Sequence, residues 1–332
     1  MERVGRRVTV LAVIAGSVLA GCGSPAEPPA PPAQNQAVAG ESAEAPPPTE
    51  TPSVTSTPSL PAAPTSAPGK PSTAASTKAA EDCPLPKSGF DCDFQRRFAA
   101  AQAYVAQRPG TVGIVVRDRT TGAVWRNDHA GDLTWTASTI KLAMVVDMLA
   151  RDRAGTITLT AADRSLITAM LHSSDDNAAD SLWSKYGGTD HTTFNAAFPR
   201  YGMTSLQPQK GYSKIYPYWG FQKCTPDDLD RLVNYVLDKV PAADRDYILG
   251  QLRTVAANQQ WGVWGAGPSA RPGNKDGWSE EDGGWVMNSV GFLGPGERYT
   301  LSIMNNLRGK GDYDDGKQTD TEVARILFAG RF

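Results

Sequence analysis

The sequence has no aromatic residue before Phe90, and this absence excludes a folded core in its first quarter. All 8 Trp, 10 Tyr and 9 Phe residues lie at or after that position, whereas 14 of the 25 prolines fall between Pro25 and Pro71. A globular core requires aromatic and branched apolar side chains. We therefore predict that residues 23–82 form a disordered Pro/Ala/Ser/Thr-rich tether, and that residues 83–332 form one folded domain.

Other absences narrow the class of protein. No apolar run reaches the roughly 20 residues of a membrane-spanning helix. The net charge of −2 gives no reason to expect a nucleic acid partner. With three histidines and no Cys/His spacing typical of zinc, we expect no metal and no other cofactor. There is no GxSxG motif, so a Ser-His-Asp triad has no support.

The N-terminus has the layout of a secretory signal peptide. Three arginines precede a short apolar stretch, Val8 to Ala20. The stretch ends in Leu19-Ala20-Gly21-Cys22, which resembles the lipobox of bacterial lipoproteins; the alternative is an ordinary signal peptide with a chance cysteine. The resemblance implies that residues 1–21 are removed and that Cys22 carries lipid. We then expect an extracytoplasmic protein, anchored to the bacterial cell membrane by two or more acyl chains.

The other three cysteines are Cys83, Cys92 and Cys224. In an oxidising compartment we expect one disulfide and one free thiol. A Cys83–Cys92 bond would close a short loop, but either cysteine could instead pair with Cys224, and the sequence leaves the pairing open.

The hydrophobic pattern predicts an α+β domain. It consists of an antiparallel sheet flanked by terminal helices, with a mostly helical subdomain at 138–245. The expected helices cover residues 91–107, 138–152, 163–172, 177–186, 190–200, a segment starting at Thr225-Pro226, and 320–328. The expected strands cover residues 111–118, 123–127, 285–293 and 299–305.

Two segments with unusual composition are given structural interpretations. Asp312-Tyr313-Asp314-Asp315-Gly316 is interpreted as a solvated loop rather than a calcium site, because no bidentate acid follows at the required spacing. An aromatic cluster could line a binding groove, but core packing is the favoured interpretation; it comprises Tyr212, Tyr216, Tyr218, Trp219 and Phe221.

A candidate catalytic pair lies at the start of the most apolar predicted helix. Ser138-Thr139-Ile140-Lys141 is an SxxK sequence. Lys141 lies one helical turn after Ser138 on the same face, so its amine can reach the hydroxyl. Burial disfavours the ammonium form, and a neutral amine is a general base. The alternative is a helix N-cap serine beside a lysine that extends to solvent.

Two later sequences make the pair more specific. Ser173-Ser174-Asp175-Asp176-Asn177 lies in a break between predicted helices, and Lys275-Asp276-Gly277-Trp278 precedes the C-terminal strands. Together the three segments resemble the SxxK, SxN and K[TS]G motifs of the penicillin-binding-protein and serine β-lactamase superfamily, in the same order. The resemblance covers residues 91–332. It is greatest to class A-like serine hydrolases and to a subgroup of secreted bacterial lipoproteins that includes the LppW type.

The resemblance implies a role for each residue. Ser138 would be the acylated nucleophile, Lys141 its base, Ser174 a proton relay, and Lys275 the group that holds an anionic part of the substrate. The oxyanion hole would use the backbone N–H of Ser138 and one near Trp278. The substrate-binding surface would be completed by Asp176, Asn177, Asp276, Gly277 and Trp278.

The sequence departs from the superfamily pattern at three points. Asp176 stands where an asparagine is usual, unless a one-residue bulge lets Asn177 take that place. Asp276 replaces a hydroxyl residue that normally meets the substrate carboxylate, so we expect weak recognition of penicillins. No glutamate occurs between Glu81 and Glu280, and the stretch 187–224 offers only Asp190 as an acid. The deacylation step of a class A β-lactamase therefore has no catalytic glutamate.

Two functions remain from this sequence. One is a serine acyl-hydrolase or acyltransferase that acts on cell-envelope amide or ester bonds through Ser138. The other is a catalytically silent module that binds peptidoglycan or a protein partner. We expect a monomer in either case. The first function requires that the Lys141 amine lose its proton; an acid that held this amine would remove the reactivity.

Overall fold

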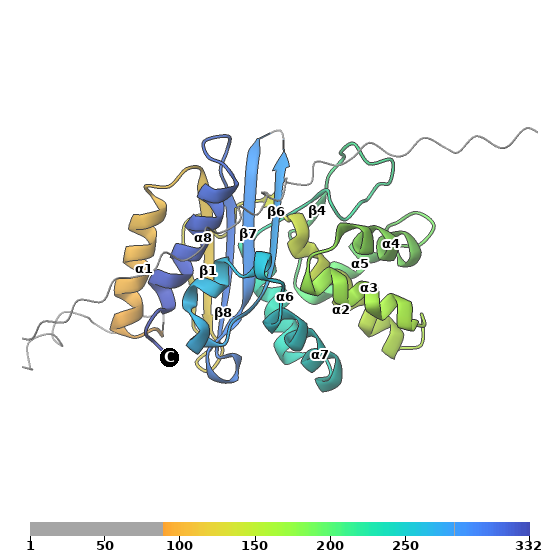
Figure 1. Cartoon of the computed structure of the whole chain (residues 1–332), viewed down its shortest axis with the longest axis horizontal. Helices are drawn as coiled ribbons and strands as arrows, with labels where there is room; N and C mark the ends of the chain where they lie inside the picture. The colour runs from red at the N-terminus through yellow and green to blue at the C-terminus, as the bar shows by residue number, and fades with distance from the viewer. Residues whose placement is uncertain (1–88, 282) are drawn as a thin grey trace, which may run out of the picture. The chain divides into compact units, whose positions relative to one another are not determined.

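A five-stranded antiparallel sheet forms the centre of the part of the chain that the computed structural model describes, residues 89–281 and 283–332. The strand order is β2-β1-β8-β7-β6, so β6 is an edge strand (Figure 1). The strands are β1 (Thr111–Asp118), β2 (Val124–Arg126), β6 (Gly273–Glu281), β7 (Gly284–Leu293) and β8 (Tyr299–Asn306). The predicted α+β class is confirmed.

The terminal helices α1 (Cys92–Val105) and α8 (Tyr313–Phe328) pack side by side on one face of the sheet (Figure 1). Their apolar sides meet alternate sheet residues such as Ile303 in one buried cluster. Within this cluster Phe94 packs against Phe98 and Phe328. Its ring centroid lies 5.5 Å from that of Phe98 and 5.7 Å from that of Phe328. Fixing both ends of the domain in one core makes the sheet a rigid support for the opposite face.

The opposite face of the sheet carries the helical subdomain. Its core surrounds α2, whose residues from Ile140 to Leu149 are all buried, and it reaches the sheet at Val290, Phe292 and Met304. A helix that is apolar all round is expected to be enclosed in this way. The elements are α2 (Ile140–Arg153), α3 (Ala161–His172), α4 (Asp176–Tyr186), α5 (Thr193–Ala197), α6 (Pro226–Asp238) and α7 (Ala242–Arg253). A small second sheet has the order β3-β5-β4, from β3 (Thr134–Trp135), β5 (Gln222–Cys224) and β4 (Gln207–Pro208).

The start of one predicted helix needs correction, and some elements of the structure were not predicted. The last helix begins at Tyr313 and not at Asp320, because Asp312 forms a capping box with Asp315; the predicted loop at 312–316 is therefore the first turn of α8. Strand β6, which contains Lys275, and helix α7 were not predicted. Polar and glycine residues interrupt the alternation of β6, and α7 has apolar residues only at scattered positions.

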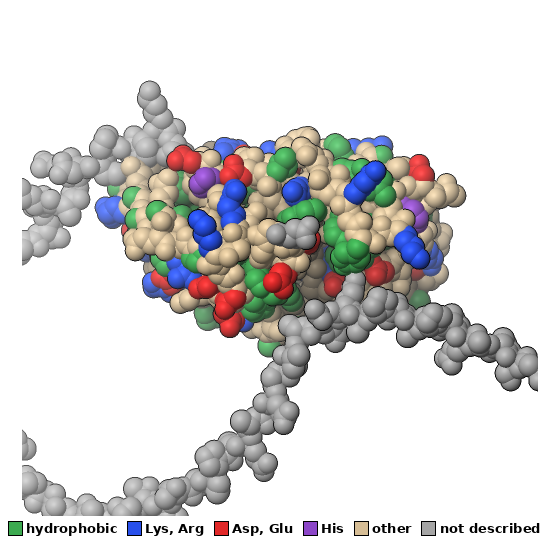
Figure 2. All heavy atoms as spheres, turned by 90° about the horizontal axis from the view of Figure 1, so that it is seen from above, with side chains coloured by type: hydrophobic (Ala, Val, Ile, Leu, Met, Phe, Trp, Pro, Cys, Tyr) green, Lys and Arg blue, Asp and Glu red, His purple; other side chains and the backbone are tan. Residues whose placement is uncertain are grey.

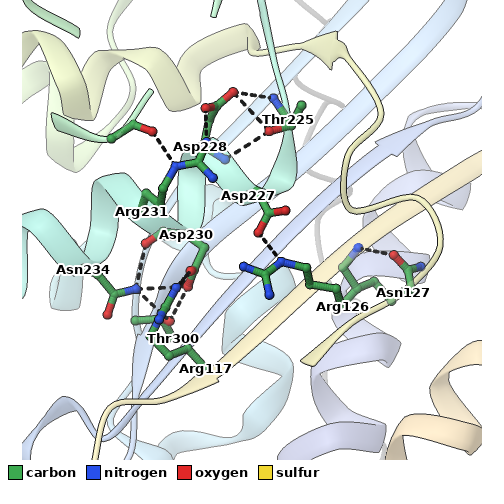
Figure 3. A network of polar contacts seen from close by, with 12 residues as sticks. Arg117, Arg126, Asn127, Thr225, Asp227, Asp228, Asp230, Arg231, Asn234 and Thr300 are labelled. Atoms are coloured by element: carbon green, nitrogen blue, oxygen red, sulfur yellow. Dashed lines mark hydrogen bonds and ion pairs between the residues drawn. The ribbon is translucent and has the colours of Figure 1, made fainter. Parts of the chain in front are cut away.

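Helix α6 is fixed to the sheet through buried acids near its N-terminus (Figure 3). Asp230 is fully buried and accepts hydrogen bonds from Arg117 on β1 and Thr300 on β8. Thr225 caps the helix, and its hydroxyl and backbone N–H exchange hydrogen bonds with Asp228. The Thr225-Pro226 start predicted from the sequence is confirmed.

Replacing the capping hydroxyl gives a first testable prediction. Thr225→Ala removes the hydroxyl that accepts a hydrogen bond from the N–H of Asp228 at 3.1 Å, so we expect a loss of about 1 kcal/mol in the free energy of unfolding. Urea unfolding monitored by circular dichroism measures it. Thr158→Ala, at an exposed site, is the matched control and should change the value by less than about 0.5 kcal/mol; equal losses in both variants would contradict the capping role.

Several sequence predictions lie outside the described residues, namely the signal peptide, the lipidated Cys22, the tether and Cys83. Within the described part, Cys224 is a buried free thiol, so it is not the partner of a disulfide. A Cys83–Cys92 bond stays a prediction.

In the described ranges no helix is long and apolar enough to cross a membrane. On the face shown in Figure 2, basic and acidic side chains are interspersed with apolar ones.

Candidate active site

Ser138 lies in a single 3-10 turn, Ala137–Thr139, that leads directly into α2. The amide of Asn288 on β7 holds this turn by donating to the carbonyl oxygens of Trp135 at 2.8 Å and Thr136 at 3.2 Å. Ala137 has a left-handed φ of 44°, a conformation that costs about 1–3 kcal/mol for a residue with a side chain. The surrounding structure therefore imposes the position of Ser138 against a local backbone preference.

Gly277 on β6 allows the edge strand to approach this turn. A Cβ atom added at Gly277 would lie 2.7 Å from the backbone nitrogens of Ser138 and Thr139. Only a residue without a side chain fits there. In the structure Ser138 thus lies next to the third motif, as predicted.

Gly277→Ala is expected to displace the Ser138 turn. Because both clashing atoms belong to the backbone, we expect a loss of about 2 kcal/mol in the free energy of unfolding. The same alanine at Gly283, where an added Cβ would meet nothing within 4 Å, is the matched control. Urea unfolding of both variants measures the difference, and wild-type stability of Gly277→Ala would contradict this close approach.

The two lysines of the motifs converge on Ser174, which joins α3 to α4. Lys275 donates to the Ser174 hydroxyl at 2.9 Å, and Lys141 donates to the Ser174 carbonyl at 2.6 Å. Ser174 also has a left-handed φ, of 62°. Both lysines are buried. Burial, followed by the charge of Lys141, lowers the pKa of Lys275 to about 7, and burial also lowers the pKa of Lys141 although Asp176 opposes this.

Asp176 occupies the second-motif position beside Lys141. Its Oδ1 accepts a hydrogen bond from the Lys141 amine at 2.5 Å, and its side chain is 58% exposed, whereas Lys141 is fully buried. Asn177 is exposed on the first turn of α4, where its backbone carbonyl accepts from Ser181. Of the two alternatives left open by the sequence, the structure brings Asp176 to the lysine and leaves Asn177 outside the group.

The Lys141 amine is therefore held by an acid. Every hydrogen-bond partner of its nitrogen is an acceptor or a hydroxyl: the Ser174 carbonyl, the Asp176 carboxylate and, at 3.5 Å, the Ser174 hydroxyl. No described residue forms a hydrogen bond with the Ser138 hydroxyl. These contacts fit an ammonium group, which has three donors and no lone pair for a proton, whereas burial lowers the pKa of this amine. The structure thus meets the condition under which the hydrolase hypothesis loses its base.

Asp276 and Trp278 lie on the reverse face of β6. Side chains alternate along a strand, so Lys275 and Gly277 face the Ser138 turn while Asp276 and Trp278 face α8. Asp276 is 1% exposed, its strand partner is Ser289, and Trp278 packs near Trp261 and Tyr313. Burial raises the pKa of Asp276 to about 8. The structure does not bring these two side chains to the surface around Ser138.

Two contributors to the site were not identified from the sequence. Trp219 lies under the Lys141 amine, 4.6 Å from the ring centroid, and its indole N–H donates to Asp180 at 2.7 Å. Tyr218 donates to the same carboxylate at 2.5 Å. The sequence did indicate an aromatic cluster in this segment. Its composition could not show that Trp219 and Phe221 are buried whereas Tyr212 and Tyr216 are exposed.

The acid expected in the loop before α6 takes no part in this arrangement. Asp190 accepts hydrogen bonds from the backbone and hydroxyl of Thr192, which lower the pKa of its carboxyl group. Those bonds bind the carboxylate within its own exposed turn. Asp176 is the only acid described in contact with the lysine pair through a side-chain hydrogen bond.

Comparison with solved structures defines the class of the fold. The chain superposes on a β-lactamase from Streptosporangium roseum (TM-score 0.59, 19% identity, covering 70% of this chain and 97% of the other). It also superposes on a β-lactamase from Xanthomonas campestris (TM-score 0.59, 17% identity, 71% and 97%) and on an ancestral class A β-lactamase (TM-score 0.57, 19% identity, 70% and 98%). The described domain has the serine β-lactamase fold, as the three motifs predicted.

The sequence itself is similar to LppW. It is 29% identical over 253 residues to the LppW proteins of Mycobacterium tuberculosis and Mycobacterium bovis, whose names describe them as lipoproteins. The match covers 73% of this chain and 77% of LppW. No protein-family model matches the chain. The predicted likeness to a β-lactamase-like protein of the LppW type is confirmed.

Proposed function

We propose that this protein is a lipid-anchored member of the β-lactamase fold that binds a peptide of the cell envelope beside Ser138, and that Asp176 suppresses acylation of this serine. The proposal depends chiefly on one observation, the 2.5 Å contact between the Lys141 amine and the Asp176 carboxylate. A carboxylate in contact favours the ammonium, and an ammonium cannot accept the proton of a serine hydroxyl. The nucleophile then remains a neutral alcohol.

The surroundings of Ser138 support a peptide as the ligand. Strand β6 is the edge of the sheet, so backbone groups on its outer side are available to an extended chain. Adding a strand to a sheet edge is a common way to bind peptides. Lys275, held by the Ser174 hydroxyl and the Asp276 carbonyl, supplies an N–H donor for an anionic group of the ligand.

Two observations support the lipid anchor. The segment Leu19-Ala20-Gly21-Cys22 has the order of small residues and cysteine that a lipobox requires, and the chain is similar to proteins named as lipoproteins. Acyl chains on Cys22 would hold the protein at the membrane, and the Pro-rich residues after it would let the domain reach the envelope polymer.

A second candidate, serine acyl transfer through Ser138, is favoured by a different observation. Ala137 and Ser174 both have left-handed backbone angles, and such angles concentrate at functional sites. Burial also lowers the pKa of Lys141, which favours the neutral base. In this case the acyl-enzyme would be hydrolysed slowly, since Asp190 is bonded within its own turn.

One pair of measurements separates the candidates. The protein is incubated with a fluorophosphonate or with penicillin and its intact mass is determined, with Ser138→Ala as the control. Separately, co-sedimentation with purified peptidoglycan is measured. We expect co-sedimentation and no Ser138-dependent adduct within an hour. A rapid adduct that Ser138→Ala abolishes would favour the second candidate, and absence of both adduct and co-sedimentation would contradict both.

A further inference from the structure

A recess that shares no residue with the Ser138 site lies where α6, α7 and two turns of the main sheet meet. Its volume is about 410 Å³. Four separate segments line it: the β1–β2 turn, the end of α6, one side of α7 and the turn before β8. The lining residues are Arg119, Leu237, Arg245, Asp246, Leu249, Gly250, Arg253, Gly296 and Glu297.

Three arginines and two acids give the lining itself a net charge of +1. Asp238, beside the lining, pairs with Arg119 at 2.6 Å. Arg119 and Arg253 each have a buried Nε–H with no acceptor among the described residues. A buried donor without a partner costs free energy, so a group that accepts from it is favoured. Among the described residues Arg245 pairs only with its neighbour Asp246, at 3.3 Å. Both side chains are largely accessible to solvent, so this contact contributes little. Its guanidinium can therefore turn to a ligand.

The turn before β8, next to these arginines, has an unfavourable backbone conformation. Glu297 has a left-handed φ of 50°, and its side chain pairs with Arg253. Arg119 donates to the carbonyl of Glu297 at 2.7 Å. Strain of this kind persists only where neighbouring contacts fix it. The arginine side chains are thus positioned before any ligand arrives.

Glycine keeps the recess open. Gly250 lies within α7, where glycine is less favourable than alanine, yet a Cβ added there would meet nothing within 4 Å. Packing does not require a glycine at this position. A Cβ added at Gly296, another lining residue, would also meet nothing within 4 Å. Leu237 and Leu249 supply an apolar surface between them.

We propose that this recess binds a small organic anion. Its carboxylate or phosphate group would accept hydrogen bonds from Arg119, Arg245 and Arg253, since guanidinium groups match planar oxyanions, and its apolar body would lie against Leu237 and Leu249. The recess has the size typical of small-molecule sites. This ligand binds independently of the proposed peptide at Ser138.

Titration calorimetry on the full-length protein tests the proposal. The probes are hexanoate and hexyl phosphate, with hexan-1-ol and inorganic phosphate as the neutral and the purely ionic comparisons. Gly250→Leu fills the recess and adds a good helix former, so it should fold at least as well as wild type by thermal unfolding. We expect at least one of the two organic anions to bind, and its affinity to fall about tenfold or more in Gly250→Leu and in Arg245→Gln.

Each result bears on the proposal. Tighter binding of hexanoate assigns a carboxylate to the site, and tighter binding of hexyl phosphate assigns a phosphate. Binding of hexan-1-ol as tight as hexanoate, or of inorganic phosphate as tight as hexyl phosphate, would overturn it. Binding unchanged in a folded Gly250→Leu variant would place the ligand elsewhere and also overturn it. None of these outcomes depends on whether Ser138 can be labelled.

Discussion

Asp176→Asn is expected to make Ser138 reactive. The substitution keeps the shape and the hydrogen-bond acceptor beside Lys141 but removes the charge that stabilises its ammonium form. An opposite charge in contact shifts a pKa by about 1–3 units, so the fraction of neutral amine should rise by about tenfold or more. We expect the rate of Ser138 labelling by a fluorophosphonate to rise by about the same factor. Time-resolved intact-mass measurement follows the adduct.

Asp175→Asn provides the control for this gain. Asp175 is the N-cap of α4, and its charge acts on the Lys141 amine more weakly than that of Asp176, which is in hydrogen-bond contact. Asparagine caps helices equally well. Its labelling rate should stay within about threefold of wild type. The double variant Ser138→Ala, Asp176→Asn should give no adduct. Equal labelling of wild type and Asp176→Asn would show that the carboxylate does not restrain the serine.

Asp276→Asn is expected to stabilise the protein at alkaline pH. Asp276 is almost fully buried, with Ser289 and Asn274 beside its carboxyl group. Burial raises its pKa to about 8, whereas an unfolded aspartate has a pKa of about 3.9. Between these values the folded state holds a proton that the unfolded state releases. The free energy of unfolding of wild type therefore falls as the pH rises from 4 to 8.

Asparagine does not titrate, so the variant should not show this part of the pH dependence. Four pH units correspond to roughly 5.5 kcal/mol for an isolated group. Because Asp276 and the adjacent buried Lys275 influence each other's titration, we expect the variant to gain only about 3 kcal/mol over wild type between pH 4 and pH 9. Urea unfolding at the two pH values measures the gain. The exposed Asp314→Asn is the control, and parallel pH profiles of wild type and Asp276→Asn would refute the prediction.

The fold was largely predictable from local patterns. The strand 111–118 and the cap at Thr225-Pro226 were located correctly because alternation and capping are properties of neighbouring residues. Strand β6 was not predicted, since most of its residues are buried by distant segments and its pattern does not alternate. The start of α8 was assigned to a loop, although its Asp312–Asp315 capping box is a local signal that could have located it.

The residues of the site were predictable from the sequence, but their arrangement in space was not. The three motifs, in their order along the chain, predicted a site formed by Ser138, Lys141, Ser174 and Lys275. In the structure both lysines donate hydrogen bonds to Ser174. The charge expected from Asp276 is absent from the surface around Ser138. Strand alternation turns that side chain away, and because β6 had not been identified as a strand, this consequence was not drawn.

The amino-acid sequence by itself determined the class of this protein, because core-forming residues, caps and catalytic motifs are encoded at short spacing along the chain. Tertiary structure alone decided whether the lysine is free. Lys141 and Asp176 are separated by 35 positions, and only the packing of α4 against α2 brings their side chains to 2.5 Å. The protonation of a buried amine depends on the charges that surround it in space. For this reason the chemistry of the site follows from contacts that no motif contains.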